Sequence, residues 1–233
     1  MGEAINQDPN ALLAAVPLFE DLDAPSLKRL ADRTKQRTYR RGQPLFYQGD
    51  PGDSLIVIIR GRVKIFLLSE DGEEVVLNTL HSGDVIGDVS LVDSGPRSAS
   101  AEAVEQTSAL VLTQDVVADE VRHNPSLALA LLRAMGRLVR RQTEQTADLV
   151  FLDLNGRVAK LVVRLAEQWG KPDGESVLID LELTQTDLAR MVGGSRQSVN
   201  QILRSFERRG FLALGSRRVT VKRLGELRKR AGL

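Results

Sequence analysis

The spacing of hydrophobic and polar residues changes twice along the 233-residue chain. Residues 8–36 have the apolar spacing of short helices, and Asp23 is placed to cap a helix that runs through Leu27, Leu30 and Ala31. From Thr38 onward, short β-rich runs alternate with turn sequences rich in glycine, aspartate and proline. The expected strands span residues 44–47, 54–60, 62–68, 74–80, 98–105 and 107–113. Strands at this spacing predict an antiparallel sandwich or barrel.

A long helical pattern follows Asn124-Pro125 and continues to about residue 152 without a proline. Apolar or uncharged residues recur there in alternating steps of four and three, which is the spacing of a two-stranded coiled-coil seam. These positions are Ala128, Leu132, Met135, Val139, Gln142, Thr146 and Leu149. The pattern predicts a dimerisation helix, 125–152; the alternative is a long helix that lies on its own β-domain.

The last third of the chain has the element order of a winged helix. The expected elements are a helix over 154–169, a strand Val177–Leu181, helices Gln185–Val192 and Arg196–Arg209, and a hairpin of 211–214 and 218–222. The fold class is therefore expected to be α+β, with a β-barrel domain over 1–124, the long helix over 125–152, and a winged helix-turn-helix domain over 153–233.

Composition favours a cytoplasmic binding protein over an enzyme. The chain has no cysteine and only two histidines, His81 and His123, so thiolate sites and histidine-based catalysis are not expected. No apolar run has the length of roughly 18–20 residues that a membrane span needs, and the N-terminus lacks the features of a secretory signal.

The net charge of +1 hides a division of charge along the chain. Residues 184–233 carry twelve Lys/Arg and three Asp/Glu, a net charge of +9, whereas the remaining residues carry a net charge of −8. A solvated basic helix would explain this, but so would a polyanion bound at one end of the protein.

Residues 183–210, LTQTDLARMVGGSRQSVNQILRSFERRG, have the pattern of a helix-turn-helix rather than a plain helical hairpin. Thr184 and Asp187 predict a capping box, Gly193-Gly194 a tight turn, and Ser195 the cap of a recognition helix. Arg196 can pair with guanine and Gln197 or Gln201 with adenine, while the arginines that follow fit phosphates. The expected DNA-binding residues are Ser195, Arg196, Gln197, Ser198, Gln201, Arg208, Arg217 and Arg218.

This helix resembles that of the cyclic-AMP receptor protein (CRP/FNR) family of bacterial transcription regulators. The family pattern Ser-Arg-Glu-Thr-Val-x-Arg corresponds to residues 195–201, SRQSVNQ, so that the serine, the first arginine and the valine match. The resemblance implies that Arg196 reads a guanine. Gln197 and Gln201 replace the family's glutamate and second arginine, which points to a different operator.

A second segment, GDVSLVDSGPRSASAEA at 87–103, has the features of an anion site. A short helix is expected to open after Gly87, its N-terminus favours an anion, and Arg97 and Ser98 add donors. The segment resembles the family's phosphate-binding cassette, Gly-Glu-x-(several)-Arg-Ser-Ala, with the shorter Asp88 in place of the glutamate that holds the ribose.

The resemblance, which covers about residues 15 to 222, also implies the rest of an effector site. The nucleotide-binding residues it implies are Ile65, Leu77, Gly87, Asp88, Arg97, Ser98, Gln142 and Thr143, with Gln142 and Thr143 at the positions of the family's adenine ligands. The loop Lys171–Glu175 corresponds to the family's RNA polymerase contact.

The function expected is that of a homodimeric regulator that binds palindromic double-stranded DNA under the control of a cyclic nucleotide, cyclic AMP, and meets RNA polymerase. Because Asp88 and Gln142 depart from the family, one alternative is a regulator that needs no ligand or responds to cyclic di-GMP or cyclic GMP. A remote alternative is a haem-based sensor that uses His81 or His123.

Overall fold

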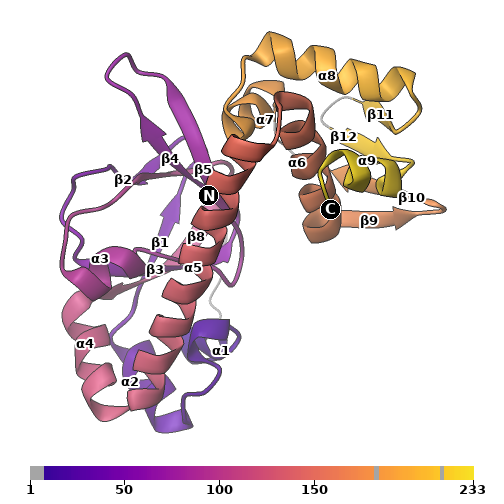
Figure 1. Ribbon diagram of the computed structural model, residues 1–233. Coiled ribbons are helices and arrows are strands. Elements are labelled where there is room, and N and C mark those ends of the chain that lie inside the picture. Colours follow the sequence, from indigo (N-terminus) through magenta and orange to yellow (C-terminus); the bar gives the residue numbers. More distant parts are fainter. Residues whose placement is uncertain (1–7, 181–183, 216–217) are drawn as a thin grey trace. The chain divides into compact units, whose positions relative to one another are not determined.

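The computed structural model describes residues 8–180, 184–215 and 218–233 (Figure 1). The chain forms two compact units, one of residues up to 73 together with 77–140, the other of residues 74–76 together with 141–233. The expected division into 1–124, 125–152 and 153–233 stays a prediction.

The N-terminal segment is helical, as its pattern predicts. Helix α1 (Pro9–Ala14), a 3₁₀ turn (Pro17–Phe19) and helix α2 (Ala24–Asp32) follow one another, and Asp23 caps α2 by accepting a hydrogen bond from the Ser26 N–H at 2.9 Å. The helical expectation for residues 8–36 extends too far, because β1 (Lys35–Tyr39) begins before Thr38. Most of β1 is exposed, so it lacks the apolar alternation that marks a strand in a sequence.

Two antiparallel four-stranded sheets form the β-domain. The first has the order β1-β8-β3-β6 and the second β2-β7-β4-β5. The strands are β2 (Pro44–Phe46), β3 (Ser54–Arg60), β4 (Val63–Leu68), β5 (Glu74–Leu80), β6 (Val85–Ile86), β7 (Ser100–Ala103) and β8 (Thr107–Thr113). The six strands expected from the sequence are present, with ends shifted by up to two residues, and β1 and the short β6 are additions.

The β-domain is buried on both faces of its first sheet. Leu55 and Val57 of β3 pack toward the helices, whereas Ile56 and Ile58 belong to a separate cluster with residues of the second sheet. Alternate side chains of a strand point to opposite faces, so this strand needs apolar residues at nearly every position. The sequence SLIVIIR meets that need.

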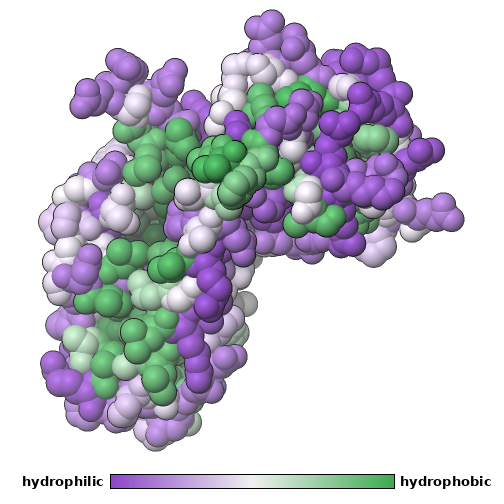
Figure 2. Space-filling view, viewed as in Figure 1, coloured by the Kyte–Doolittle hydropathy of each residue, from purple (hydrophilic) through white to green (hydrophobic). Residues whose placement is uncertain are grey.

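Helix α5 (Pro125–Phe151) follows α4 (Gln114–His123) and presents two different faces. Leu127, Ala130 and Leu131 are buried against the β-domain. On the predicted seam, Leu132 and Val139 are 62% and 63% exposed. Figure 2 shows apolar residues over the face of α5 that is turned to the viewer. The helix thus packs on its own domain and also leaves the seam uncovered in the single chain.

The second unit contains the elements of a winged helix-turn-helix. Helices α6 (Leu154–Trp169), α7 (Gln185–Val192), α8 (Arg196–Arg208) and α9 (Leu224–Arg230) surround one core. A sheet of order β11-β12-β10-β9 accompanies them, with β9 (Gly170–Asp173), β10 (Ser176–Asp180), β11 (Leu212–Gly215) and β12 (Arg218–Val221). The α+β architecture expected from the sequence is confirmed.

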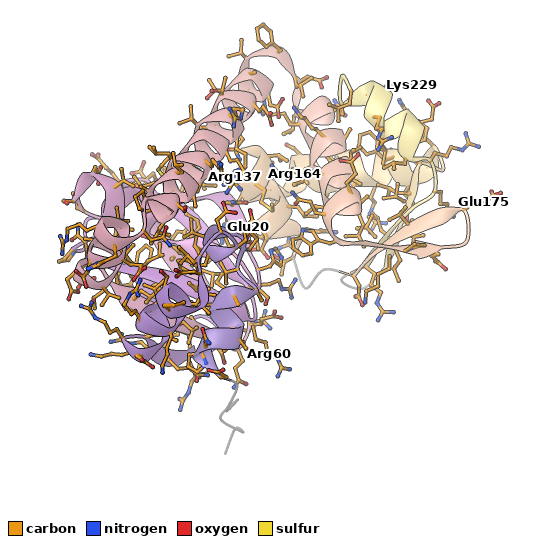
Figure 3. All side chains as sticks on the ribbon, turned by 90° about the horizontal axis from the view of Figure 1, so that it is seen from below. Glu20, Arg60, Arg137, Arg164, Glu175 and Lys229 are labelled. Atoms are coloured by element: carbon orange, nitrogen blue, oxygen red, sulfur yellow. The ribbon has the colours of Figure 1, made fainter. Side chains whose placement is uncertain are left out.

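Two details of this unit differ from expectation. Residues 171–175, expected as a loop, form most of β9 and the turn to β10, and Figure 3 shows Glu175 at the outer end of that hairpin. Helix α9 has no counterpart among the expected elements. Leu181, expected to end a strand, lies outside the described residues.

Within the described ranges, no helix is long and apolar enough to cross a membrane.

Candidate functional site

Arg97 is held in place through its backbone. It lies between α3 (Asp88–Asp93) and β7, and its N–H donates to the carbonyl of Asp50 at 2.8 Å. Its own carbonyl accepts from the N–H of Gly49 at 2.9 Å. These two bonds join it to the turn after β2, and its side chain runs into the domain with only 4% of the residue surface exposed.

The guanidinium of Arg97 is enclosed but only partly hydrogen-bonded. Its Nη2 donates to the Ser54 hydroxyl at 2.9 Å and lies 3.8 Å from an Asp53 carboxylate oxygen. The Phe46 ring covers one side, with its centroid 4.2 Å from Cζ. The Nε and Nη1 atoms are buried without a hydrogen-bond partner among the described residues.

The buried Arg97 guanidinium, with two unused hydrogen-bond donors, would be stabilised by an anion. Burial lowers the pKa of Arg97, and Asp53 and Asp50 oppose that shift. A guanidinium starts from so high a pKa that it stays charged in proteins, so it cannot relieve its desolvation by losing a proton. A phosphate would supply the opposite charge and accept from the donors left without a partner.

Gly87 makes room for this arginine. It precedes α3 with φ of +90°, and a Cβ there would lie 2.2 Å from Arg97 Nη1 and 2.6 Å from the Ser54 carbonyl oxygen. Both the backbone conformation and the space therefore require glycine. The expectation that a short helix opens after Gly87 is confirmed.

Replacing Gly87 with alanine is expected to lower the free energy of unfolding by about 1–3 kcal/mol, because alanine is strained at positive φ. The variant is also expected to lose anion affinity, because the added Cβ displaces the guanidinium. Gly83→Ala is the matched control, since Gly83 has φ of +89° with nothing within 4 Å of its Cβ position. Chemical denaturation and nucleotide calorimetry measure both effects. Equal nucleotide affinity in the two variants would contradict the spatial role of Gly87.

The other expected effector residues differ in their exposure. Ser98 is exposed, and Asp88 is half-buried at the start of α3. Ile65 on β4 and Leu77 on β5 are also half-buried. The roles of these residues stay predictions.

Gln142 and Thr143 lie on α5 and are both exposed. They belong to the unit of residues 74–76 and 141–233, whereas Arg97 belongs to the other unit, so their expected part in nucleotide binding stays a prediction.

Two positioning residues could not be found from the sequence. Phe46 and Ser54 contact the Arg97 side chain from β2 and from the start of β3. They stand more than forty residues before Arg97, and neither belongs to the motif around it. A phenylalanine and a serine in β-rich runs read as ordinary strand residues, so no local signal marks them.

The turn between α7 and α8 has the chemistry expected of a helix-turn-helix. Thr184 and Asp187 form a full capping box, with the Thr184 N–H 2.8 Å from the Asp187 carboxylate and the Asp187 N–H 3.2 Å from the Thr184 hydroxyl. Gly193 ends α7 with φ of +63°. Ser195 then caps α8 by accepting from the Ser198 N–H at 3.0 Å.

Helix α8 separates a packing face from an exposed polar face. Val199, Leu203 and Phe206 are buried, and Ile202 packs against the same core. The exposed positions are Arg196, Gln197, Gln201, Arg204 and Arg208. The last four are spaced at i, i+4, i+7 and i+11, so one stripe of amides and guanidinium groups runs along the helix. Such a face can hydrogen-bond to base edges and phosphates.

The remaining DNA-binding candidates have different surroundings. Ser195 and Ser198 share a hydrogen bond between their hydroxyls at 2.8 Å, so both already serve the cap. Arg218 on β12 pairs with Asp180 of β10 at 3.1 Å, with both side chains largely exposed. Arg217 lies outside the described residues.

The two histidines differ in their exposure. His81 lies in the loop after β5 but is half-buried, and burial lowers its pKa to about 4. His123 is exposed at the end of α4. In the part of the chain that the structure describes, no group of three potential metal ligands occurs.

A β-domain that encloses an arginine, followed by a long helix and a winged helix-turn-helix, defines a class of DNA-binding protein. The profile of the cyclic nucleotide-binding domain matches residues 36–124, and that of the Crp-like helix-turn-helix domain matches residues 156–230. The chain belongs to the CRP/FNR family of DNA-binding transcription regulators and has a cyclic nucleotide-binding domain.

Relatives match nearly the whole chain. The CRP-like cAMP-activated global transcriptional regulator of Mycobacterium tuberculosis is 33% identical over 94% of this chain and 98% of its own length. The cyclic AMP receptor protein of Thermus thermophilus is 32% identical over 88% of this chain and 92% of its own. The c-di-GMP responsive global regulator CLP of Xanthomonas campestris shares the fold, with a TM-score of 0.73, 24% identity, and coverage of 85% and 99%.

Proposed function

We propose that this protein is a homodimeric, sequence-specific regulator of transcription that acts in the cytoplasm and that cyclic AMP switches to an activating, DNA-bound form. The observation that carries the proposal is the buried Arg97 guanidinium, whose Nε and Nη1 have no partner among the described residues. A cyclic phosphodiester is an anion small enough to be enclosed with a guanidinium.

The choice of cyclic AMP rests on relatives. Two proteins that are 33% and 32% identical over most of this chain are named as a cAMP-activated regulator and a cyclic AMP receptor protein. The nucleotide is proposed to contact Gly87, Asp88, Arg97 and Ser98 through its phosphate and ribose, and Ile65 and Leu77 through its base. Gln142 and Thr143 are proposed as base ligands from α5.

The dimer is proposed to form along α5. The seam residues Leu132, Val139 and Leu149 are each at least 60% exposed, although the helix buries Leu127 and Leu131 on its own domain. Large apolar side chains at coiled-coil spacing are unfavourable in water, and a second α5 in the same register would cover them.

The double substitution Leu132→Glu with Val139→Glu is expected to make the protein monomeric, because four carboxylates would face one another in the dimer seam. Sedimentation velocity should then give one 25.6-kDa chain, whereas the unchanged protein should give twice that mass. Arg137→Glu is the control, because Arg137 is exposed on α5 outside the seam (Figure 3). A dimer that survives the double substitution would exclude this interface.

The ligand can act as a switch only if it binds the DNA-competent dimer more tightly than other states. In that state the two α8 helices are proposed to enter successive major grooves about 34 Å apart on a palindrome. Fluorescence anisotropy with a labelled palindrome, titrated with cyclic AMP, tests this. Unchanged DNA affinity at saturating nucleotide would remove the switch and leave the DNA-binding proposal to be judged separately.

A second candidate is the same regulator with a different effector or none. Asp88, one methylene shorter than the glutamate of the family cassette, would need a water or a shifted sugar to bind the ribose 2′-hydroxyl. A protein of the same fold is named as c-di-GMP responsive. Calorimetry with cyclic AMP, cyclic GMP and cyclic di-GMP separates these effectors, and heat from none of them would favour a ligand-independent regulator. A Soret band in the purified protein would revive the haem alternative.

RNA polymerase is proposed as a further partner, by resemblance, through the segment 171–175. The structure places this segment in a projecting hairpin, with Lys171, Asp173 and Glu175 exposed.

A further inference from the structure

Arg157 uses one guanidinium to bind two different helix ends. It lies on the first turns of α6, where its Nε donates to the carbonyl oxygen of Val192 at 3.0 Å and its Nη1 donates to the carbonyl oxygen of Leu152 at 3.2 Å. Val192 is the last residue of α7, and Leu152 directly follows α5. All three residues belong to the same compact unit.

Both acceptors are carbonyl groups that a helix cannot satisfy itself. The last four carbonyls of a helix have no intrahelical donor. At the end of α7, the Gly193 and Gly194 N–H groups both donate to the carbonyl oxygen of Ala189. The carbonyl oxygen of Val192 accepts from Arg157 instead. The positive charge of Arg157 is also favourable next to the C-terminal end of α7, which is the negative end of the helix dipole.

The turn that leads into α8 is pressed against the same helix α6. A Cβ on Gly194 would lie 2.8 Å from a methyl carbon of Leu154, so the turn and α6 are in direct contact. Ser195 and Arg196 follow this turn immediately. The direction in which α8 presents Arg196 is therefore set by how α7 and its turn sit on α6.

The same face of α6 also holds the last turns of α5. Lys160 binds the Asp148 carboxylate at 2.6 Å, and Arg164, labelled in Figure 3, lies one further turn along. Burial lowers the pKa of Arg164, and the charge of Asp148 opposes that shift. Arg157, Lys160 and Arg164 recur at helical spacing, but in the described residues only Arg157 has bonds to both α7 and the segment after α5.

We infer that Arg157 is a positioning residue that links the turn between α7 and α8 to the segment that follows α5 at Leu152. The position of that segment then sets the orientation of α8. The inference rests on the proposed DNA-binding function. A displacement of the Leu152 carbonyl is transmitted to the Val192 carbonyl by the Arg157 guanidinium, which is rigid and planar, rather than by a flexible chain. A lysine at this position has a single nitrogen on a flexible stem and cannot reproduce the two-point fork.

The test compares the full-length protein with Arg157→Lys and Arg157→Ala. Operator sites are first selected from random DNA with the unchanged protein, and affinity is then measured for the operator and for a random duplex. Loss of two charge-assisted bonds is expected to weaken operator binding about tenfold or more, while random-duplex binding changes less than about threefold. Phosphate contacts tolerate a tilted α8, but base contacts do not.

Hydrogen exchange supplies a readout that does not depend on DNA. Amides of residues 193–199 are expected to exchange faster in Arg157→Lys, while amides of α6 stay protected. Lys160→Ala is the matched control, because it removes a bond between α6 and α5 without reaching α7. It should leave both readouts as in the unchanged protein.

The inference is overturned if Arg157→Lys keeps operator affinity, or if operator and random-duplex affinity fall together with the melting temperature in both variants. If the unchanged protein selects no operator, the proposed function fails, and hydrogen exchange alone decides the role of Arg157. Unaltered exchange at 193–199 would then reject it.

Discussion

Arg97→Ala is expected to abolish the nucleotide response while leaving the fold intact. The substitution deletes the buried cation whose Nε and Nη1 have no partner among the described residues. Two charge-assisted hydrogen bonds to a phosphate are worth about 3–6 kcal/mol together, so the nucleotide Kd should rise at least 100-fold, at about 1.4 kcal/mol per factor of ten. Calorimetry measures this loss directly.

The same substitution should not destabilise the empty protein. Arg97 is 4% exposed and its guanidinium is short of hydrogen bonds, which is a cost to the folded state that alanine removes. The melting temperature without nucleotide is therefore expected to stay level or rise. Nucleotide at about 100 times the Kd of the unchanged protein should stabilise that protein by about 2.7 kcal/mol and the variant by at most about 0.4 kcal/mol.

Arg60→Ala controls for the loss of a positive charge from the β-domain, because Arg60 is exposed at the end of β3 (Figure 3). It should bind nucleotide as the unchanged protein does. Equal nucleotide affinity in the Arg97 and Arg60 variants would show that the phosphate lies elsewhere.

Arg196→Ala is expected to have the largest effect on DNA recognition. Arg196 is exposed on the first turn of α8, directly after the Ser195 cap. A bidentate contact between arginine and guanine is worth about 1–3 kcal/mol, and a dimer on a palindrome makes it twice. Operator affinity should fall by about 30-fold or more, while affinity for random duplexes should change little.

Base substitution in the operator distinguishes the loss of a base contact by Arg196 from a general loss of positive charge. Replacing the contacted guanine pair in both half-sites should weaken the unchanged protein but not the Arg196 variant. Arg208→Ala provides the contrast, because an exposed arginine at the far end of α8 is expected to bind phosphate. That variant should weaken all duplexes alike and reduce the salt slope by about one unit per subunit. Identical behaviour of the two variants would refute base reading by Arg196.

Much of the fold could be predicted because its signals are local. The cap at Asp23, the capping box at Thr184 and the turn at Gly193 each depend on residues within four positions of one another. The alternation of the β-runs and the apolar steps of α5 are equally local. These local patterns predict the order of the elements without reference to any tertiary contact.

The misses have tertiary causes. Strand β1 has four exposed residues out of five and is a strand because it pairs with β8, which no pattern within it records. Strand β9 pairs with β10 around the positive-φ turn at Gly174, although a loop is expected over residues 171–175. His81 is half-buried because of neighbours that its loop sequence does not reveal.

The candidate site divides in the same way. Gly87 and Arg97 stand out in one segment of the sequence, whereas Phe46 and Ser54 come near Arg97 only when the sheets form. Arg157 reaches Val192 across thirty-five residues. Residues that hold other residues in place are the hardest to predict. Their side chains are of common types, and their role depends on tertiary contacts that the local sequence does not show.

The uncovered seam on α5 makes DNA binding by the regulator depend on the concentration of the protein itself. If pairing of two copies precedes binding, occupancy of a promoter at low copy number rises with the square of the protein concentration. Halving synthesis would then reduce occupancy about fourfold in that regime. Gene dosage and effector level would together set the output of such a system.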